Sequence, residues 1–207
     1  MQALFSQISQ QVSALTAIEF IAVVAAIAYL LLAIRQSIWC WLFAAVSTAI
    51  YVYLFIEAKL YMESFLNGFY FLMAAYGWHV WRTGGDSSAE LPVSVWPFRI
   101  HSLAIVSIAL LGLLTGYLLQ RFTDAALPYI DSLTTLGAIW ATFLVARKVL
   151  ENWWYWLAID VASVAVYWSR DLQLTALLFM VYVVLIPFGL VSWRRSLARQ
   201  RSLAMTA

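Results

Sequence analysis

Charged residues are scarce in this chain of 207 residues. Asp, Glu, Lys and Arg make up 11% of it, whereas a soluble domain carries about 25%. Hydrophobic residues make up 65%, and the composition therefore predicts an all-α membrane protein. No polar stretch is long enough for a separate soluble domain, and a formal net charge of +2 is too small to indicate a nucleic-acid partner.

Cysteine and catalytic motifs are sparse as well. The single cysteine, Cys40, excludes a disulfide within the chain. The sequence has no Walker A loop, no His/Cys/Glu cluster with metal-site spacing and no nucleophile beside a base. We therefore expect a protein that is not an enzyme and that holds no metal or cofactor.

Long apolar runs make up most of the chain. A membrane-spanning helix needs about 20 predominantly apolar residues. Seven runs approach or reach this length, and we predict transmembrane helices at 17–34, 38–56, 63–81, 100–119, 127–146, 153–169 and 172–193. The remaining segments are an interfacial segment at 1–16, a linker with turn-forming residues at 82–99 and a basic tail at 194–207.

Basic residues divide unevenly between the two sides of the bilayer that these spans define. One side receives Lys59, Arg121 and Arg170. The other side receives Arg35, Arg82, Arg99, Arg147, Lys148, Arg194, Arg195, Arg199 and Arg201. Because cytoplasmic segments carry the excess of Lys and Arg, we expect the C-terminus in the cytoplasm and the N-terminus outside.

Recurring residues indicate an internal repeat. The recurring pairs are Glu19 with Asp131, Arg35 with Arg147, Trp81-Arg82 with Trp193-Arg194, and Trp41-Leu42 with Trp156-Leu157. Acid and arginine bracket the first and fifth runs at the same separation of 16 residues. We therefore predict two parallel three-helix repeats, at 17–81 and 127–193, joined by a connector helix at 100–119.

The sixth run carries a polar stripe. Residues three or four apart share one face of a helix, and this rule aligns Trp153, Trp156, Asp160, Ser163 and Tyr167. Lipid offers no partner to a carboxylate in the middle of a span, so this face should adjoin protein or a water-filled cavity. Aromatic rings beside an acid suit a flat, cationic solute. The alternatives are interfacial anchoring by the tryptophans and an interhelical hydrogen bond by Asp160. Trp154 and Tyr155 project off the stripe, and we expect them to be interfacial anchors.

Other runs supply further candidates for a binding site. Asn67 can both donate and accept hydrogen bonds, although an interhelical bond is the alternative. Thr175 and Tyr182 share a face of the seventh run. The recurring Trp-Leu pair places Trp41 opposite Trp156, which predicts a cavity with a tryptophan on each side. The acids at 19 and 131 complement helix dipoles in the first turn of their runs.

Several segments resemble the PnuC family of vitamin-precursor transporters. They are Leu60-Tyr61, Tyr76-Gly77-Trp78-His79-Val80-Trp81, Asp131-Ser132, and residues 147–156, which include the Asn-Trp-x-x-Trp element from Asn152 to Trp156. The resemblance covers roughly residues 17–195. It implies seven transmembrane helices in a 3+1+3, SWEET-like arrangement in a bacterial inner membrane. A homotrimer is implied too, although the predicted bundle is complete within one chain.

The resemblance also implies uptake of nicotinamide riboside by facilitated diffusion with alternating access, after which a cytoplasmic kinase traps the substrate. Trp156 and Tyr182 would then stack on the ring, and Asp160 would balance its charge. Asn67 and Thr175 would bond the polar edges, and Asn152, Trp153 and Trp41 would complete the site. The family's nicotinamide riboside transporters typically carry glutamine where this chain has Asn67, which keeps thiamine and riboflavin open as cargo. A membrane sensor or assembly protein that binds a partner helix is a further alternative.

Overall fold

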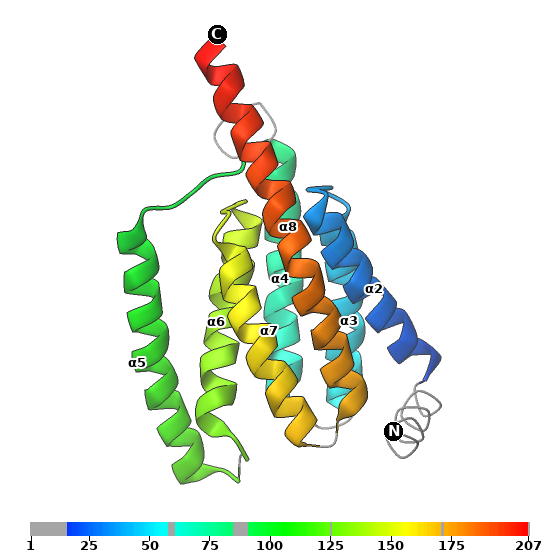
Figure 1. Cartoon of the computed structure of the whole chain (residues 1–207). Helices are drawn as coiled ribbons and strands as arrows, with labels where there is room; N and C mark the ends of the chain where they lie inside the picture. Colours follow the sequence, from blue (N-terminus) through cyan, green and yellow to red (C-terminus); the bar gives the residue numbers. More distant parts are fainter. Residues whose placement is uncertain (1–15, 58–60, 85–90, 125, 171, 207) are drawn as a thin grey trace.

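The computed structural model describes residues 16–57, 61–84, 91–124, 126–170 and 172–206, and these are mainly helical (Figure 1). The helices are α2 (Ala17–Ile34), α3 (Cys40–Glu57), α4 (Tyr61–Thr83), α5 (Phe98–Phe122), α6 (Pro128–Ala146), α7 (Asn152–Ser169) and α8 (Gln173–Thr206). All seven predicted runs are therefore helices. The interfacial segment predicted at 1–16 lies outside the described residues except for Thr16.

Hydropathy separates the seven helices into two groups. Within the described residues, α2, α3, α5, α6 and α8 are the five helices long and apolar enough to cross a membrane. The other two helices, α4 and α7, carry polar residues within their length, including Glu63 and Asn67 in α4 and Asp160 in α7. Below, these side chains are found on the inner faces of α4 and α7, which explains why both sequences are less apolar.

The predicted basic tail at 194–207 is helical in its described part, because α8 does not end near residue 193. It continues as a helix to Thr206 and carries its arginines on that extension (Figure 1). After Pro187 and Gly189 the sequence contains no further proline or glycine, and most of its residues favour a helix. The turn chemistry that would stop the helix is therefore absent from this sequence.

Six of the helices form a closed ring. In chain order each contacts the next, from α2 to α3, α4, α6, α7 and α8, and α8 packs back on α2. Helix α5 packs mainly on α6 and lies outside the ring (Figure 1). The helix predicted as the connector between the two three-helix repeats (the two triplets) thus lies outside the ring that the other six helices form.

Helix α2 begins with a capping box. The Glu19 carboxylate accepts from the Thr16 backbone N–H at 2.6 Å, and the Thr16 hydroxyl oxygen accepts from the Glu19 N–H at 3.3 Å. This arrangement confirms the interpretation of Glu19 as a first-turn acid. Asp131 lies in the first turn of α6, 4.0 Å from the guanidinium of Arg170 at the end of α7.

A tryptophan layer fills the ring at one end, which we call the arginine-rich end because α2, α4, α6 and α8 all run toward their arginines there. The layer consists of Trp41, Trp81, Trp193 and Trp153, each at most 5% exposed. Successive rings in this order have centroids 5.5, 6.3 and 5.5 Å apart and meet edge to face. Such pairs add stability beyond the area that they bury.

Two glycines make room for this layer. A Cβ atom added at Gly77 would collide with the ring of Trp41, and one added at Gly189 would collide with the ring of Trp153. The absence of a side chain at each glycine therefore lets the tryptophan of one helix lie directly on the backbone of another.

Indole hydrogen bonds join the two halves of the ring at the same end. The Trp81 N–H donates to the carbonyl of Ala146 at 3.1 Å, and the Trp193 N–H donates to the carbonyl of Ala33 at 3.0 Å. α4 is thereby tied to the end of α6, and α8 is tied to the end of α2.

Candidate functional site

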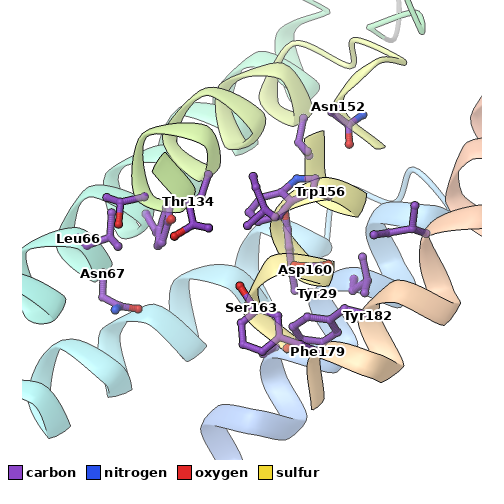
Figure 2. Close-up of a pocket in the computed structure, with 18 of the residues that line it drawn as sticks. Tyr29, Leu66, Asn67, Thr134, Asn152, Trp156, Asp160, Ser163, Phe179 and Tyr182 are labelled. Atoms are coloured by element: carbon purple, nitrogen blue, oxygen red, sulfur yellow. The ribbon is translucent and has the colours of Figure 1, made fainter. Parts of the chain in front are cut away.

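The ring encloses a cavity of about 400 Å³ (Figure 2). All six ring helices contribute to its lining, and aromatic side chains dominate it. These aromatic residues are Tyr29, Phe55, Tyr70, Trp153, Trp156, Tyr167, Phe179 and Tyr182. A largely apolar cavity with a few polar groups is typical of a small-molecule site.

The polar wall of the cavity is one face of α7. Asn152, Trp156, Asp160 and Ser163 follow one another along this helix and all line the cavity, as Figure 2 shows. Their exposed fractions are 0% for Asn152, 3% for Asp160 and 9% for Ser163. The prediction that this stripe faces a cavity rather than lipid is confirmed.

Asp160 has no counter-ion among the described residues that line the cavity. Its Oδ1 atom is buried and has no hydrogen-bond partner among the described residues. The described residues that line the cavity include a second acid, Glu63, but none of them is Lys, Arg or His. An isolated buried carboxylate is costly, so a cation that enters the cavity would gain from this position.

Asn152 lies at the start of α7, next to the tryptophan layer. Its side-chain N–H donates to the carbonyl of Val149 at 2.7 Å, while its Oδ1 atom is buried and has no partner among the described residues. Trp153 also lines the cavity, and its indole N–H is unpaired within the same set of residues. The site therefore offers one unpaired acceptor and one unpaired donor at this end.

Asn67 and Tyr182 line the cavity from α4 and α8. The Asn67 side chain donates to the backbone carbonyl of Glu63 at 2.9 Å, which leaves its own carbonyl oxygen to accept from a solute. Tyr182 lies edge to face with Phe179 at 5.6 Å, and Phe179 stacks on Tyr167 at 5.3 Å. This chain of rings links α8 to the polar wall on α7.

Two predicted site residues do not line the cavity. Trp41 is 2% exposed and belongs to the tryptophan layer, and Thr175 is half-buried elsewhere on α8. The recurring Trp-Leu pair placed Trp41 opposite Trp156, but in its packing on a glycine Trp41 resembles Trp153 instead. The described lining of the cavity therefore has no tryptophan from α3.

The lining includes residues that were absent from the candidate site, among them Tyr29, Tyr70 and Glu63. Tyr70 precedes Tyr182 by 112 positions, the same interval that separates Glu19 from Asp131. Applying this interval along the whole chain would have found Tyr70. Nothing comparable in the sequence singled out Tyr29, a tyrosine within an apolar run.

Trp154 and Tyr155, which precede Trp156, lie in different surroundings from each other. Trp154 is 50% exposed, in agreement with an anchoring role at the membrane surface. Tyr155 was assigned the same role, but its hydroxyl lies 3.1 Å from Nδ1 of His101 on α5. Within the described residues, no group of three or more His, Cys, Asp and Glu side chains is arranged to hold a metal ion.

Comparison with known proteins supplies the family. The family model described as nicotinamide mononucleotide transporter matches residues 16–195. The chain belongs to this family. The match covers α2 to α7 in full and α8 as far as residue 195.

The individual relatives of this chain are distant from it in sequence. The nicotinamide riboside transporter PnuC of Escherichia coli (strain K12) is 24% identical over 209 residues, which cover 89% of this chain and 87% of that protein. The riboflavin/roseoflavin transporter RibM of Streptomyces davaonensis is 26% identical over 171 residues, covering 79% and 78%. A crystal structure of the vitamin B3 transporter PnuC shares the fold, with a TM-score of 0.70 and 20% identity over 95% of this chain and 90% of that one.

Proposed function

We propose that this membrane protein carries nicotinamide riboside across a bacterial inner membrane by facilitated diffusion. The observation that carries this proposal is the buried Oδ1 atom of Asp160, which has no partner among the described residues and lies within a cavity lined by aromatic rings. Nicotinamide riboside has a flat ring with a fixed positive charge, which both the carboxylate and the π-faces attract. Its carboxamide and ribose hydroxyls can use Asn152 and Asn67.

Charge also argues against a phosphorylated cargo. The lining carries the acids Glu63 and Asp160, and none of its described residues is basic. A phosphate group would therefore meet repulsion and no arginine or lysine partner. The nucleoside rather than the mononucleotide is thus the favoured substrate. Phosphorylation by a cytoplasmic kinase would convert it into an anion that the cavity no longer accepts.

Riboflavin and thiamine remain alternative cargo within the same class. The relative RibM is named for riboflavin, and it is as similar to this chain as the PnuC relatives are. Riboflavin is neutral and gains little from Asp160, whereas thiamine is cationic and would gain as much as nicotinamide riboside. A direct comparison of the three ligands on one preparation separates them.

We infer a 3+1+3 arrangement in which α2–α4 and α6–α8 are parallel repeats and α5 is the connector. An interval of 112 positions relates Trp41 to Trp153, Gly77 to Gly189 and Trp81 to Trp193. It also relates Gln36 to Lys148, whose φ angles of 57° and 49° both lie in the rare left-handed region. The order of contacts repeats as well, since α4 packs on α6 as α8 packs on α2.

Alternating access would consist of movement of one triplet against the other. The tryptophan layer closes the cavity at the arginine-rich end, and the bonds from Trp81 to Ala146 and from Trp193 to Ala33 hold it closed. The excess of basic residues supports placing this end in the cytoplasm, with the N-terminus outside. Release would then require both indole–carbonyl bonds to break. The resemblance to the PnuC family supports a homotrimer as the assembly.

Trp156 and Trp154 offer a matched test of the cavity. We expect Trp156→Ala to weaken binding of nicotinamide riboside at least tenfold, because it removes a ring that lines the cavity. Trp154→Ala removes an equal ring from the same helix, but that ring is half exposed, so binding should be unchanged. Isothermal titration calorimetry on both purified variants measures the difference. Equal losses from the two substitutions would refute the placement of the site.

A further inference from the structure

The first turn of α7 has two functional faces. Asn152 and Trp156, four residues apart, line the cavity. Glu151 and Tyr155 are also four residues apart, and they lie about 100° around the same helix. They contact α5 and the segment that precedes it, away from the cavity, and Tyr155 also interacts with Trp140 of α6. Any rotation of this turn therefore moves both faces together.

A buried histidine occupies the outer face of this turn. His101 projects from α5 and is 8% exposed. Its Nδ1 lies 3.1 Å from the Tyr155 hydroxyl, and its Nε2 lies 3.7 Å from Oε2 of Glu151. If the Tyr155 hydroxyl donates to Nδ1, the ring carries its proton on Nε2, facing the carboxylate. Both nitrogens then have a polar neighbour on α7 or at its cap.

The segment before α5 joins the same junction through its backbone. The Trp96 N–H donates to Glu151 at 3.4 Å. Ser94 donates its N–H to the carbonyl of Lys148 at 3.0 Å and accepts from the N–H of Leu150 at 2.8 Å. The backbone of α5 packs on α6, and these side-chain and loop contacts connect α5 to the start of α7.

The other triplet carries residues that cannot make this connection. Positions 39 and 43 precede Glu151 and Tyr155 by the repeat interval of 112, and they are tryptophan and phenylalanine. Trp39 is 55% exposed and Phe43 is 37% exposed. The polar cluster therefore occurs in the triplet whose second helix supplies the polar wall of the cavity. The triplet that makes the polar contacts with α5 is thus the same triplet that supplies the polar wall of the cavity.

We propose that His101, Tyr155 and Glu151 are positioning residues for the binding site. They fix the rotation of the first turn of α7, so that Asn152 and Trp156 point into the cavity. The connector α5 thus has a role in substrate affinity, although it contributes no described residue to the cavity lining. This inference rests on the proposed function in one respect, namely that the cavity is where the substrate binds.

Two Tyr→Phe substitutions test this role. Tyr155→Phe removes the hydroxyl beside His101, and the control Tyr129→Phe removes a hydroxyl that donates to Gln120 of α5 at 2.8 Å, far from the cavity wall. We expect Tyr155→Phe to raise the dissociation constant of nicotinamide riboside roughly threefold to tenfold, as for the loss of one hydrogen bond. Tyr129→Phe should leave it unchanged. His101→Leu should match Tyr155→Phe, and His101→Asn, which retains an acceptor near the position of Nδ1, should restore most of the affinity.

Amide hydrogen exchange of residues 150–157 provides a readout that needs no ligand. Exchange there should accelerate in Tyr155→Phe and His101→Leu but not in Tyr129→Phe. The proposal is overturned if exchange does not change, if both Tyr→Phe variants alter affinity equally, or if His101→Asn fails to restore binding. A parent protein that binds no nicotinamide riboside would refute the proposed function instead, while the exchange comparison would still test the connection between α5 and α7.

Discussion

Replacing Asp160 with asparagine should weaken binding of nicotinamide riboside by roughly tenfold to a hundredfold, the range expected when a charged partner is lost from a buried contact. The carboxylate is 3% exposed, and none of the described cavity-lining residues is basic, so no other group offsets its charge. Asparagine has nearly the same size and shape, and it retains one acceptor. The loss would therefore report the charge rather than packing.

Asp131→Asn is the matched control for this substitution. Asp131 also lies on a ring helix, but its carboxylate is 44% exposed and pairs with Arg170 at 4.0 Å. Exposed ion pairs contribute little, so binding should change by less than about twofold. Calorimetric titration of both variants with nicotinamide riboside measures the effect. If Asp160→Asn binds as tightly as the parent, Asp160 is not the counter-ion of the substrate.

Alanine at Gly189 should have the second large effect. The added Cβ would collide with Trp153, which both lines the cavity and belongs to the tryptophan layer. Overpacking of this kind costs about 1–3 kcal/mol, and it also displaces a ring from the site. We therefore expect both a lower midpoint of thermal unfolding and weaker substrate binding.

Two other glycines separate these effects. Gly77→Ala would displace Trp41, which lies outside the cavity lining, so stability should fall while affinity is largely kept. At Gly68 an added Cβ would have no described atom within 4 Å apart from its two chain neighbours and the backbone of its own helix. Alanine should therefore be tolerated there. Thermal unfolding in detergent, together with a binding titration, gives both quantities for each variant. Equal behaviour of Gly189→Ala and Gly68→Ala would contradict the described packing.

Periodicity predicted the polar wall of the cavity because it depends on a local rule. Asp160 and Ser163 share a helix face with Trp156, and a polar face in a membrane helix must adjoin protein or water. The seven helices followed from apolar length for the same reason. Neither prediction required knowledge of which helices are neighbours.

Contacts between helices could not be predicted in this way. Trp41 and Trp156 were matched through a recurring dipeptide, whereas Trp41 matches Trp153 because each lies on a glycine of another helix. Tyr155 was assigned to the membrane surface because aromatic residues gather there, but α5 places His101 beside its hydroxyl. Both points depend on which helix covers a given face. In a single sequence, such contacts between helices are indicated only by residues that recur at a fixed interval, such as the interval of 112 positions.

Uptake of radiolabelled nicotinamide riboside into proteoliposomes without any ion gradient tests the central claim most directly. We predict entry until the inner and outer concentrations are equal, inhibition by excess unlabelled nicotinamide riboside, and no inhibition by the mononucleotide. Proteoliposomes that carry Asp160→Asn should take up far less at low substrate concentration. Uptake of riboflavin or thiamine without nicotinamide riboside, or equal competition by the mononucleotide, would contradict the account.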